Sequence, residues 1–218
     1  MHQGIPPAIE KLRMQAPCNE LSYGFVMSCL EGYSAPRAKL TKLLNAGALI
    51  RVKKGLYVFG PLFQRGPISK EVLANLIYGP SYISLEWALQ HYRMLPEAVV
   101  EVTSVTTKPA KIFTSPIGRF SYAHCHAKNY PMGIVQVEFS EYQRALMATP
   151  EKAACDLLVI RRGKVNSLRE LTAILLEDYR FEPGDLIALD IAKIQRIYLD
   201  YPHSSIEYFI KYLTRKSR

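Results

Sequence analysis

The sequence is poor in the residues and patterns that mark several large classes of protein. Its four cysteines among 218 residues form no CxxC pair and no dense framework, so the thiols are expected to be free. No run of about 18 apolar residues is present, and no transmembrane helix is predicted. Residues 1–11 lack the charged-then-apolar order of a signal peptide. These absences together predict a cytoplasmic protein that does not enter a membrane.

The common catalytic and cofactor motifs are absent as well. The chain contains no Walker loop, no GxSxG, no HExxH and no Rossmann glycine pattern. One cluster is typical of a metal site: His124, Cys125 and His126, whose two imidazoles would lie on the same side of a strand. No third ligand can be identified, whereas structural zinc sites usually show two ligand pairs. We therefore expect neither a metal nor a cofactor.

Scattered acidic residues leave one enzymatic alternative open. Glu101 and Glu138 fall on predicted strands, where metal-dependent nucleases often place carboxylates. No strand carries the acid-x-Lys pair that this class of nuclease needs. A non-enzymatic function is the interpretation that the sequence favours, and a metal-dependent nucleic-acid enzyme is the alternative.

Positive charge is concentrated near the N-terminus. The composition is that of an ordinary folded protein, with 49% apolar and 22% charged residues. The net charge is +9, and residues 1–66 account for +6 of it through nine Lys and Arg against three acids. A focused basic region is typical of nucleic-acid contact. A membrane-surface domain would instead favour a long amphipathic helix with exposed large apolar residues, which this region lacks.

The basic region contains the pattern of a helix. Ser34 is a good N-cap, and Pro36 suits the first turn, where a backbone N–H has no partner. An apolar stripe with helical spacing follows, and Gly47 then supplies a left-handed residue that commonly ends a helix. The polar residues Arg37, Lys39, Thr41, Lys42 and Asn45 fall off that stripe. They are the residues that would face a partner.

A tight basic hairpin follows the helix. With residues 53–55 as the loop, Val52 would face Leu56 and Ile50 would face Val58 on one side of a two-stranded ribbon. Gly55 can take the positive φ that such a loop needs. The basic residues of this hairpin, expected to point to solvent or to a partner, are Arg51, Lys53 and Lys54.

Residues 1–60 are therefore predicted to form a winged helix-turn-helix. Residues 23–30 are a short apolar segment, and a Gly-containing turn joins them to the helix described above. Residues 5–14 can add a supporting helix. In such a domain the second helix of the motif reads DNA, and the hairpin is the wing. The alternative is a helix and a hairpin that only pack on the rest of the chain, with a solvated basic face.

A linker and a second domain follow. Residues 61–67 are rich in Pro and Gly, which is typical of a linker. Residues 68–218 read as helices, then a small mostly antiparallel sheet, then more helices, so the fold class is α+β. The predicted strands are 99–106, 111–113, 119–124 and 134–139, and the predicted helices are 69–78, 84–95, 149–160, 167–179, 184–198 and 204–216.

Several stretches in the same order resemble the AbiEi family, antitoxins and transcriptional regulators of type IV toxin–antitoxin systems in viral defence. They are the wing VKKGLYV at 52–58, SYISLEWALQHYRMLPE at 81–97, VTSVTTKPAKIFTSPIGRFSYAH at 102–124 and ATPEKAACDLL at 148–158. The match spans roughly residues 20 to 160. Trp87 and Arg93 stand where the family pattern has small residues.

The resemblance implies a specific function. Family members bind inverted repeats in their own promoter through the winged helix and repress their operon. Their second domain counteracts a nucleotidyltransferase-like toxin, which is usually encoded next door. For this chain the expected partners are thus double-stranded DNA and such a toxin. The residues expected to contact DNA are Arg37, Lys39, Thr41, Lys42, Asn45, Arg51, Lys53 and Lys54.

Overall fold

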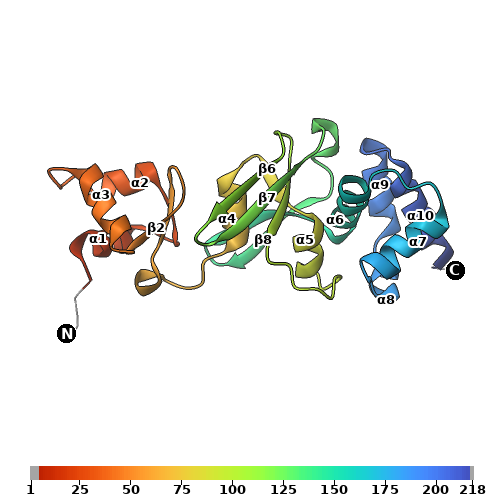
Figure 1. Ribbon diagram of the computed structural model, residues 1–218, viewed down its shortest axis with the longest axis horizontal. Coiled ribbons are helices and arrows are strands. Elements are labelled where there is room, and N and C mark those ends of the chain that lie inside the picture. Colours follow the sequence, from red (N-terminus) through yellow and green to blue (C-terminus); the bar gives the residue numbers. More distant parts are fainter. Residues whose placement is uncertain (1–4, 217–218) are drawn as a thin grey trace.

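The structure, a computed structural model, describes residues 5–216 and contains both helices and strands. Residues 1–4 of the predicted first domain and 217–218 of the second lie outside the described residues. The elements follow one another along the long axis of the molecule, from α1–α3 at one end to α9 and α10 at the other (Figure 1). The predicted α+β class is confirmed.

Residues 7–59 form helix, strand, two helices and a hairpin. The elements are α1 (Pro7–Gln15), β1 (Glu20–Ser22), α2 (Tyr23–Cys29), α3 (Pro36–Asn45), β2 (Leu49–Lys53) and β3 (Leu56–Phe59). The strands make an antiparallel sheet in the order β1-β3-β2. Apolar residues of all three helices and of one face of this sheet form a core of their own, with Leu12, Val26, Leu43, Tyr57 and Phe59 among its buried members.

Both ends of α3 are set by local chemistry. Pro36 occupies the first turn as expected, but the predicted cap at Ser34 is wrong, because Ala35 occupies the cap position and no side chain caps the helix. At the other end Gly47 has φ +67, and the amides of Gly47 and Ala48 bond back to the carbonyls of Leu44 and Leu43. This is the Schellman arrangement, which satisfies the last carbonyls of the helix.

The hairpin differs from its predicted register by one residue. Ile50 pairs with Val58 as expected, but Lys53 pairs with Leu56, and the register shifts between Arg51 and Lys53. The turn is therefore two residues, Lys54 and Gly55, with Gly55 at φ +86. The bulge keeps Val52 buried on the same side as Leu56.

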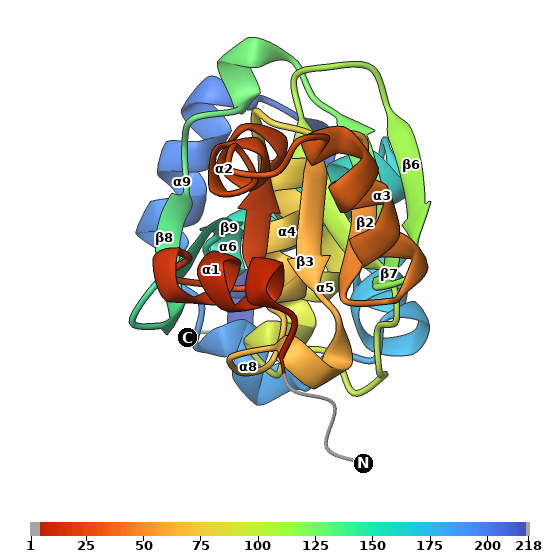
Figure 2. The same ribbon diagram turned by 90° about the vertical axis from the view of Figure 1, so that its left-hand side faces the viewer.

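A second difference concerns what covers the hairpin. Val52, Leu56 and Val58 do not join the N-terminal core but belong to the core of the second domain, together with Leu73 and Ile77 of α4 (Lys70–Ile77). The three-stranded sheet is thus buried on both faces, by α1–α3 on one side and by α4 on the other (Figures 1 and 2). The predicted domain boundary at residue 60 does not coincide with a boundary in packing.

Helix α4 lies between this sheet and a larger one. The larger sheet has the order β6-β7-β5-β4-β9-β8, with β5–β7 and β4–β9 parallel and the other pairs antiparallel. The predicted sheet is present, but it is mixed: three of its five strand pairs are antiparallel and two are parallel. Its strands are β4 (Ser81–Ile83), β5 (Val102–Thr106), β6 (Lys111–Ser115), β7 (Gly118–His124), β8 (Ile134–Ser140) and β9 (Gln143–Ala148).

Two tyrosines show which helices cover which face of the larger sheet. Tyr122 and Tyr82 point to opposite faces. The Tyr122 hydroxyl donates to the carbonyl of Ala74 in α4, at 2.6 Å. The Tyr82 hydroxyl donates to Asp156 in α6 (Pro150–Asp156), at 2.9 Å. Helix α5 (Leu85–His91) lies on the side of α6, and its Trp87 amide donates to Thr103. The sheet is therefore sandwiched between α4 and the helices that follow.

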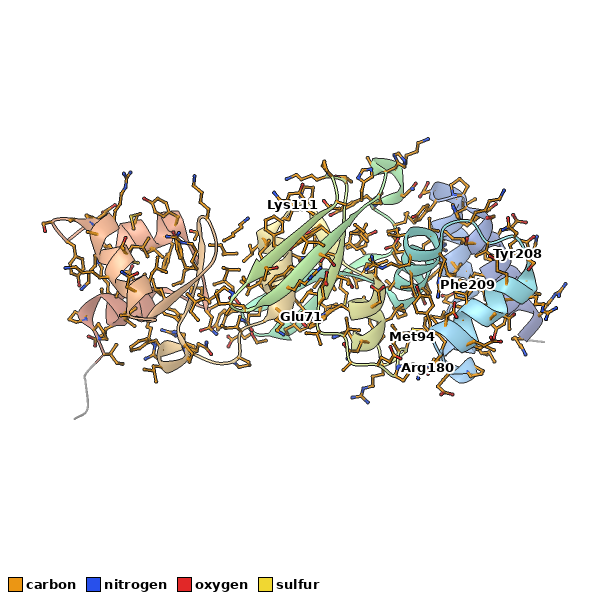
Figure 3. The ribbon with its side chains drawn as sticks, viewed as in Figure 1. Glu71, Met94, Lys111, Arg180, Tyr208 and Phe209 are labelled. Carbon is orange, nitrogen blue, oxygen red and sulfur yellow. The ribbon has the colours of Figure 1, made fainter. Side chains whose placement is uncertain are left out.

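The remaining helices close the far end of the molecule. They are the π-helical segments η3 (Leu157–Arg162) and η4 (Ile174–Asp178) and the α-helices α7 (Leu168–Ala173), α8 (Pro183–Ile187), α9 (Ile191–Asp200) and α10 (Ser204–Lys216). Phe209 is buried among them, whereas Tyr208 lies further out (Figure 3). Of the short 3₁₀ turns, η1 (Pro61–Phe63) packs on the N-terminal core through Phe63, and η2 (Ala127–Asn129) connects β7 to β8. None of the helices within residues 5–216 has the length and apolar character that a bilayer span requires.

Several element predictions for the second domain need correction. Strands β4 and β9 were not predicted, because one is three residues long and the other lacks a run of β-branched residues. The predicted helix 184–198 is two helices, α8 and α9, with Asp190 capping the second. Ser84 occupies the cap position of α5, but its hydroxyl donates to Asp156 at 2.8 Å instead of capping.

Candidate nucleic-acid interface

The outward face of α3 is exposed to solvent along its length. Arg37, Thr41 and Asn45 are spaced four residues apart and are all exposed, and Lys42 lies beside them. Leu43 on the opposite side is buried in the N-terminal core. The helix therefore presents a guanidinium, a hydroxyl, an ammonium and a side-chain amide to any partner. The Thr41 hydroxyl already donates to the carbonyl of Arg37, at 3.1 Å, so it remains available mainly as an acceptor.

A shallow hollow of about 250 Å³ lies at the start of α3. It is lined by Tyr33, Ser34, Ala35, Ala38, Lys39 and Lys42. Lys39 is half-buried there, with its ammonium 5.0 Å from the centre of the Tyr33 ring. Since no side chain caps α3 and no acid occupies its first turn, the amides of that turn face outward at the positive end of the helix dipole. The hollow is suited to a negatively charged group.

Two basic residues of the hairpin are exposed near α3. Arg51 lies on β2, with its guanidinium 5.9 Å from the centre of the Tyr57 ring. Lys54 is exposed in the two-residue turn. Both side chains are exposed, as expected of residues that point to solvent or to a partner.

Lys53 does not fit that expectation. Its ammonium donates to the carbonyls of Leu76, at 2.9 Å, and Ile77, at 2.5 Å, the last two residues of α4. Burial lowers the pKa of Lys53, and the neighbouring charge of Lys108 lowers it further. The prediction that Lys53 points to solvent or to a partner is wrong, because the bulge at Val52 turns its side chain toward the second domain.

Basic residues of the second domain lie close to the hairpin. The Lys108 ammonium donates to the carbonyl of Gly79 and lies 5.3 Å from the Tyr78 ring. Lys111, on the edge strand β6, lies 4.9 Å from the Phe113 ring (Figure 3). The charge count along the sequence missed this grouping, because these lysines are diluted by acids elsewhere in residues 67–218.

The geometry of α3 fits the reading of a DNA groove. The major groove of B-DNA, about 12 Å wide, admits one α-helix. An Arg can pair with guanine through two hydrogen bonds, and an Asn can do so with adenine. Arg37 lies in the first turn of α3 and Asn45 is its last residue. The helix could therefore contact bases near its start while its cationic side chains contact phosphates.

The other candidate sites gain no support from the structure. His124 and His126 lie with ring centres 5.6 Å apart, and the described residues hold no group of three or more possible ligands suited to a metal ion. Glu101 pairs with Arg119, at 2.9 Å, and Glu138 with Arg144, at 3.4 Å, so the two acids lie in separate ion pairs. No nuclease-like cluster is formed by these carboxylates.

Sequence reasoning missed a buried ion pair in the second domain. The side chains of Lys152 and Asp156 are fully buried, with Nζ and Oδ1 2.9 Å apart. Asp156 also accepts from Tyr82 and Ser84, and Lys152 also donates to the carbonyl of Asn129, at 2.9 Å. The spacing of Lys152 and Asp156, four residues apart on a predicted helix, was the available signal. This network joins α6 to β4 through Tyr82 and to η2 through Asn129.

Comparison with known proteins adds no family assignment. No protein-family model matches the chain, and no curated protein matches it.

Proposed function

We propose that residues 7–59 form a winged helix-turn-helix that binds double-stranded DNA with α3 in the major groove. The observation that carries the proposal is the exposed outer face of α3, where Arg37, Thr41, Lys42 and Asn45 lie together. The hollow with an uncapped helix start and the exposed Arg51 and Lys54 supply sites for phosphate. The net charge of +6 in residues 1–66 supports the same partner.

The resemblance to the AbiEi family makes the proposal more specific. The chain would be a cytoplasmic, non-enzymatic repressor that binds inverted repeats in its own promoter. Its second domain would counteract a nucleotidyltransferase-like toxin. The support is the order of the four similar stretches between residues 52 and 158 and the α+β character of the second domain. Of the two residues that depart from the family pattern, Trp87 donates its indole N–H to Glu71 of α4, at 3.1 Å, and Arg93 is exposed.

A gel-shift experiment tests DNA binding. The full chain is incubated with labelled DNA from upstream of its own gene and with a scrambled duplex, in the presence of Mg²⁺ or Mn²⁺. A shift that prefers the upstream DNA, without cleavage, is the expected result. Cleavage that a chelator abolishes would support the nuclease alternative, and equal binding to both duplexes would remove the role as a sequence-specific repressor.

A growth assay tests the antitoxin role separately. The full chain is expressed with a nucleotidyltransferase encoded next to its gene, alongside a variant in which Arg37 and Lys42 are both changed to Ala. We expect both proteins to restore growth, because the changes lie on α3 and not on the second domain. Failure of both, with protein levels confirmed by immunoblot, would leave a regulator without antitoxin activity.

A further inference from the structure

The hairpin β2–β3 has a place in the fold that a DNA-contacting wing does not need. All four residues of β3 are buried, two against the N-terminal core and two against the second domain. A wing that contacted DNA along its whole length would need one face of the hairpin free of other parts of the chain. Here that face is covered by α4.

Lys53 forms the polar part of this contact. The last four carbonyls of an α-helix have no partner within the helix, and a cation near them is favoured by the helix dipole. The Lys53 ammonium donates to two of these carbonyls in α4, those of Leu76 and Ile77. Val52 and Leu56 on either side of it are buried against the second domain. Lys53 is thus held at the junction by its hydrogen bonds to α4 and by the burial of its neighbours Val52 and Leu56.

The hairpin also holds the start of the helix-turn-helix. The carbonyl of Gly55, in the turn, accepts from the amide of Tyr23, at 2.9 Å. Tyr23 is the first residue of α2, and α2 packs on α3 in the N-terminal core. A short chain of contacts therefore runs from the end of α4 through Lys53 and the turn to the helices that would meet DNA.

Two further contacts fix the other side of the junction. The Asn19 side chain donates to the carbonyl of Gly66 and accepts from the amide of Arg65, both at 3.0 Å. Gln143 of β9 donates to Glu20 of β1, at 3.0 Å. With Lys53 on the hairpin side, the N-terminal region is held at points well separated along the sequence.

From this geometry, and resting on the proposed DNA binding, we infer that Lys53 is a positioning residue. It fixes the orientation of α3 relative to the second domain and does not contact DNA. The hairpin works as the joint between the two domains, and only Lys54 at its turn and Arg51 on its edge remain as phosphate contacts. The chain then meets DNA as one rigid unit.

Two neighbouring variants test the inference as a matched pair. Lys53→Met and Lys54→Met remove the same ammonium and keep a similar stem, but only Lys53 contacts α4. No hydrogen bond or ion pair to the Lys54 ammonium forms within residues 5–216. Hydrogen–deuterium exchange of the full chain, without DNA, reports the junction directly. We expect faster exchange in β2, β3 and the end of α4 for Lys53→Met and no change for Lys54→Met.

Salt dependence of DNA binding supplies the second readout. Each phosphate contact contributes about −0.9 to the slope of log affinity against log salt. Lys54→Met should make the slope shallower by about one unit, whereas Lys53→Met should leave it unchanged. Loss of positioning should still weaken the affinity of Lys53→Met by about 2- to 30-fold. Lys53→Arg, whose guanidinium can donate to the same carbonyls, should restore both exchange and affinity.

The outcomes separate this inference from the proposed function. A shallower slope for Lys53→Met with unchanged exchange would show that Lys53 reaches phosphate, and the inference would be overturned. Unchanged exchange and unchanged affinity would overturn it as well. If the full chain binds no DNA at all, the proposed function fails, and the exchange experiment alone still shows whether Lys53 holds the junction.

Discussion

At the scale of single residues, the exposed side of α3 combines groups suited to bases with groups suited to phosphate. Arg37 lies in the first turn, where base contacts of a recognition helix concentrate. Arg51 lies on the hairpin, where phosphate contact is the usual role. The two guanidiniums are alike in chemistry, so any difference in their effect on DNA binding reports their positions.

Replacement of Arg37 tests that division. Arg37→Ala should weaken binding to the specific site by ~1–3 kcal/mol and leave binding to scrambled DNA nearly intact. Arg51→Ala should weaken both to a similar extent, because a phosphate contact carries no sequence information. Competition binding with specific and scrambled duplexes measures both. Equal losses for Arg37→Ala on the two duplexes would assign it to phosphate.

The buried pair of Lys152 and Asp156 carries a second prediction. Asp156→Asn removes the negative charge but keeps an acceptor for Tyr82 and Ser84. The Lys152 ammonium, fully buried, would then lack its counter-ion, a change that typically costs about 3–5 kcal/mol. Urea unfolding followed by circular dichroism measures the loss. Glu138→Gln, which breaks the exposed pair with Arg144, serves as control and should leave the midpoint unchanged.

The four thiols should differ in reactivity. Cys29, Cys125 and Cys155 are buried, whereas Cys18 is half-buried at the junction. Burial raises the pKa of Cys125 to about 11 and that of Cys155 still further, so neither forms thiolate near neutral pH. With a disulfide reagent at pH 8, Cys18 should react first and slowly, because burial raises its pKa as well. Rapid reaction of several thiols before unfolding would contradict the packing described here.

At the scale of elements, the exit from the hairpin depends on one close approach. The amide of Gly60 donates to the carbonyl of Ala48, at 2.9 Å. A Cβ added at Gly60 would lie 1.8 Å from the carbonyl oxygen of Gly47, which is backbone and cannot move aside easily. The end of α3 and the end of the hairpin are therefore in direct contact.

Gly60→Ala should destabilise the chain by about 1–3 kcal/mol or more, since overpacking forces the backbone to shift. Gly184→Ala is the control, because no heavy atom lies within 4 Å of the added Cβ and the residue is in helix α8. There Ala should be neutral or slightly stabilising. Thermal unfolding of both variants compares them, and a Gly60→Ala midpoint equal to that of Gly184→Ala would contradict the close approach.

Elements with strong local signals were predictable from the sequence. Ser69, Thr149 and Ser167 cap their helices through hydrogen bonds to residues three positions later, as their sequence positions indicate. Gly47 and Gly55 take the positive φ that was expected of them. Local chemistry decides these features, so a local pattern reveals them.

Features that depend on partners far along the chain were not predictable. Ser84 occupies a cap position, yet its hydroxyl donates a hydrogen bond to Asp156, 72 residues away. Lys53 lies beside the hairpin turn, yet its ammonium donates to backbone carbonyls at the end of α4. In the candidate interface, the sequence places five polar residues off the apolar stripe of α3, because an amphipathic helix has one buried side. Four of them are exposed and Lys39 is half-buried; the exposed ones are Arg37, Thr41, Lys42 and Asn45. Which hairpin lysine faces outward depended on a bulge that the sequence does not mark.

At the scale of the whole molecule, the shared use of α4 determines which parts can exist alone. Residues 1–66 would leave Val52, Leu56 and Val58 uncovered, because α4 begins at Lys70. An exposed apolar face of this kind favours association and lowers stability.

A fragment of residues 1–66 should therefore unfold at a lower temperature than the same region of the full chain, and it should self-associate. Light scattering and thermal unfolding measure these properties. A fragment that also includes α4, residues 1–79, should improve both by covering the hairpin. If residues 1–66 are monomeric and as stable as in the full chain, the contact with α4 contributes little.

The position of β4 in the larger sheet has a consequence for how the chain matures during synthesis. This three-residue strand lies at the centre of the sheet, between β5 and β9, and it leaves the ribosome before either neighbour. The Tyr82 hydroxyl of this strand also lacks its hydrogen-bond acceptor until Asp156 has been synthesised. Helices α1–α3 would thus be complete in sequence long before the second domain. A nascent chain paused between these two points would already contain α4, but α4 would lack most of the sheet on which it packs.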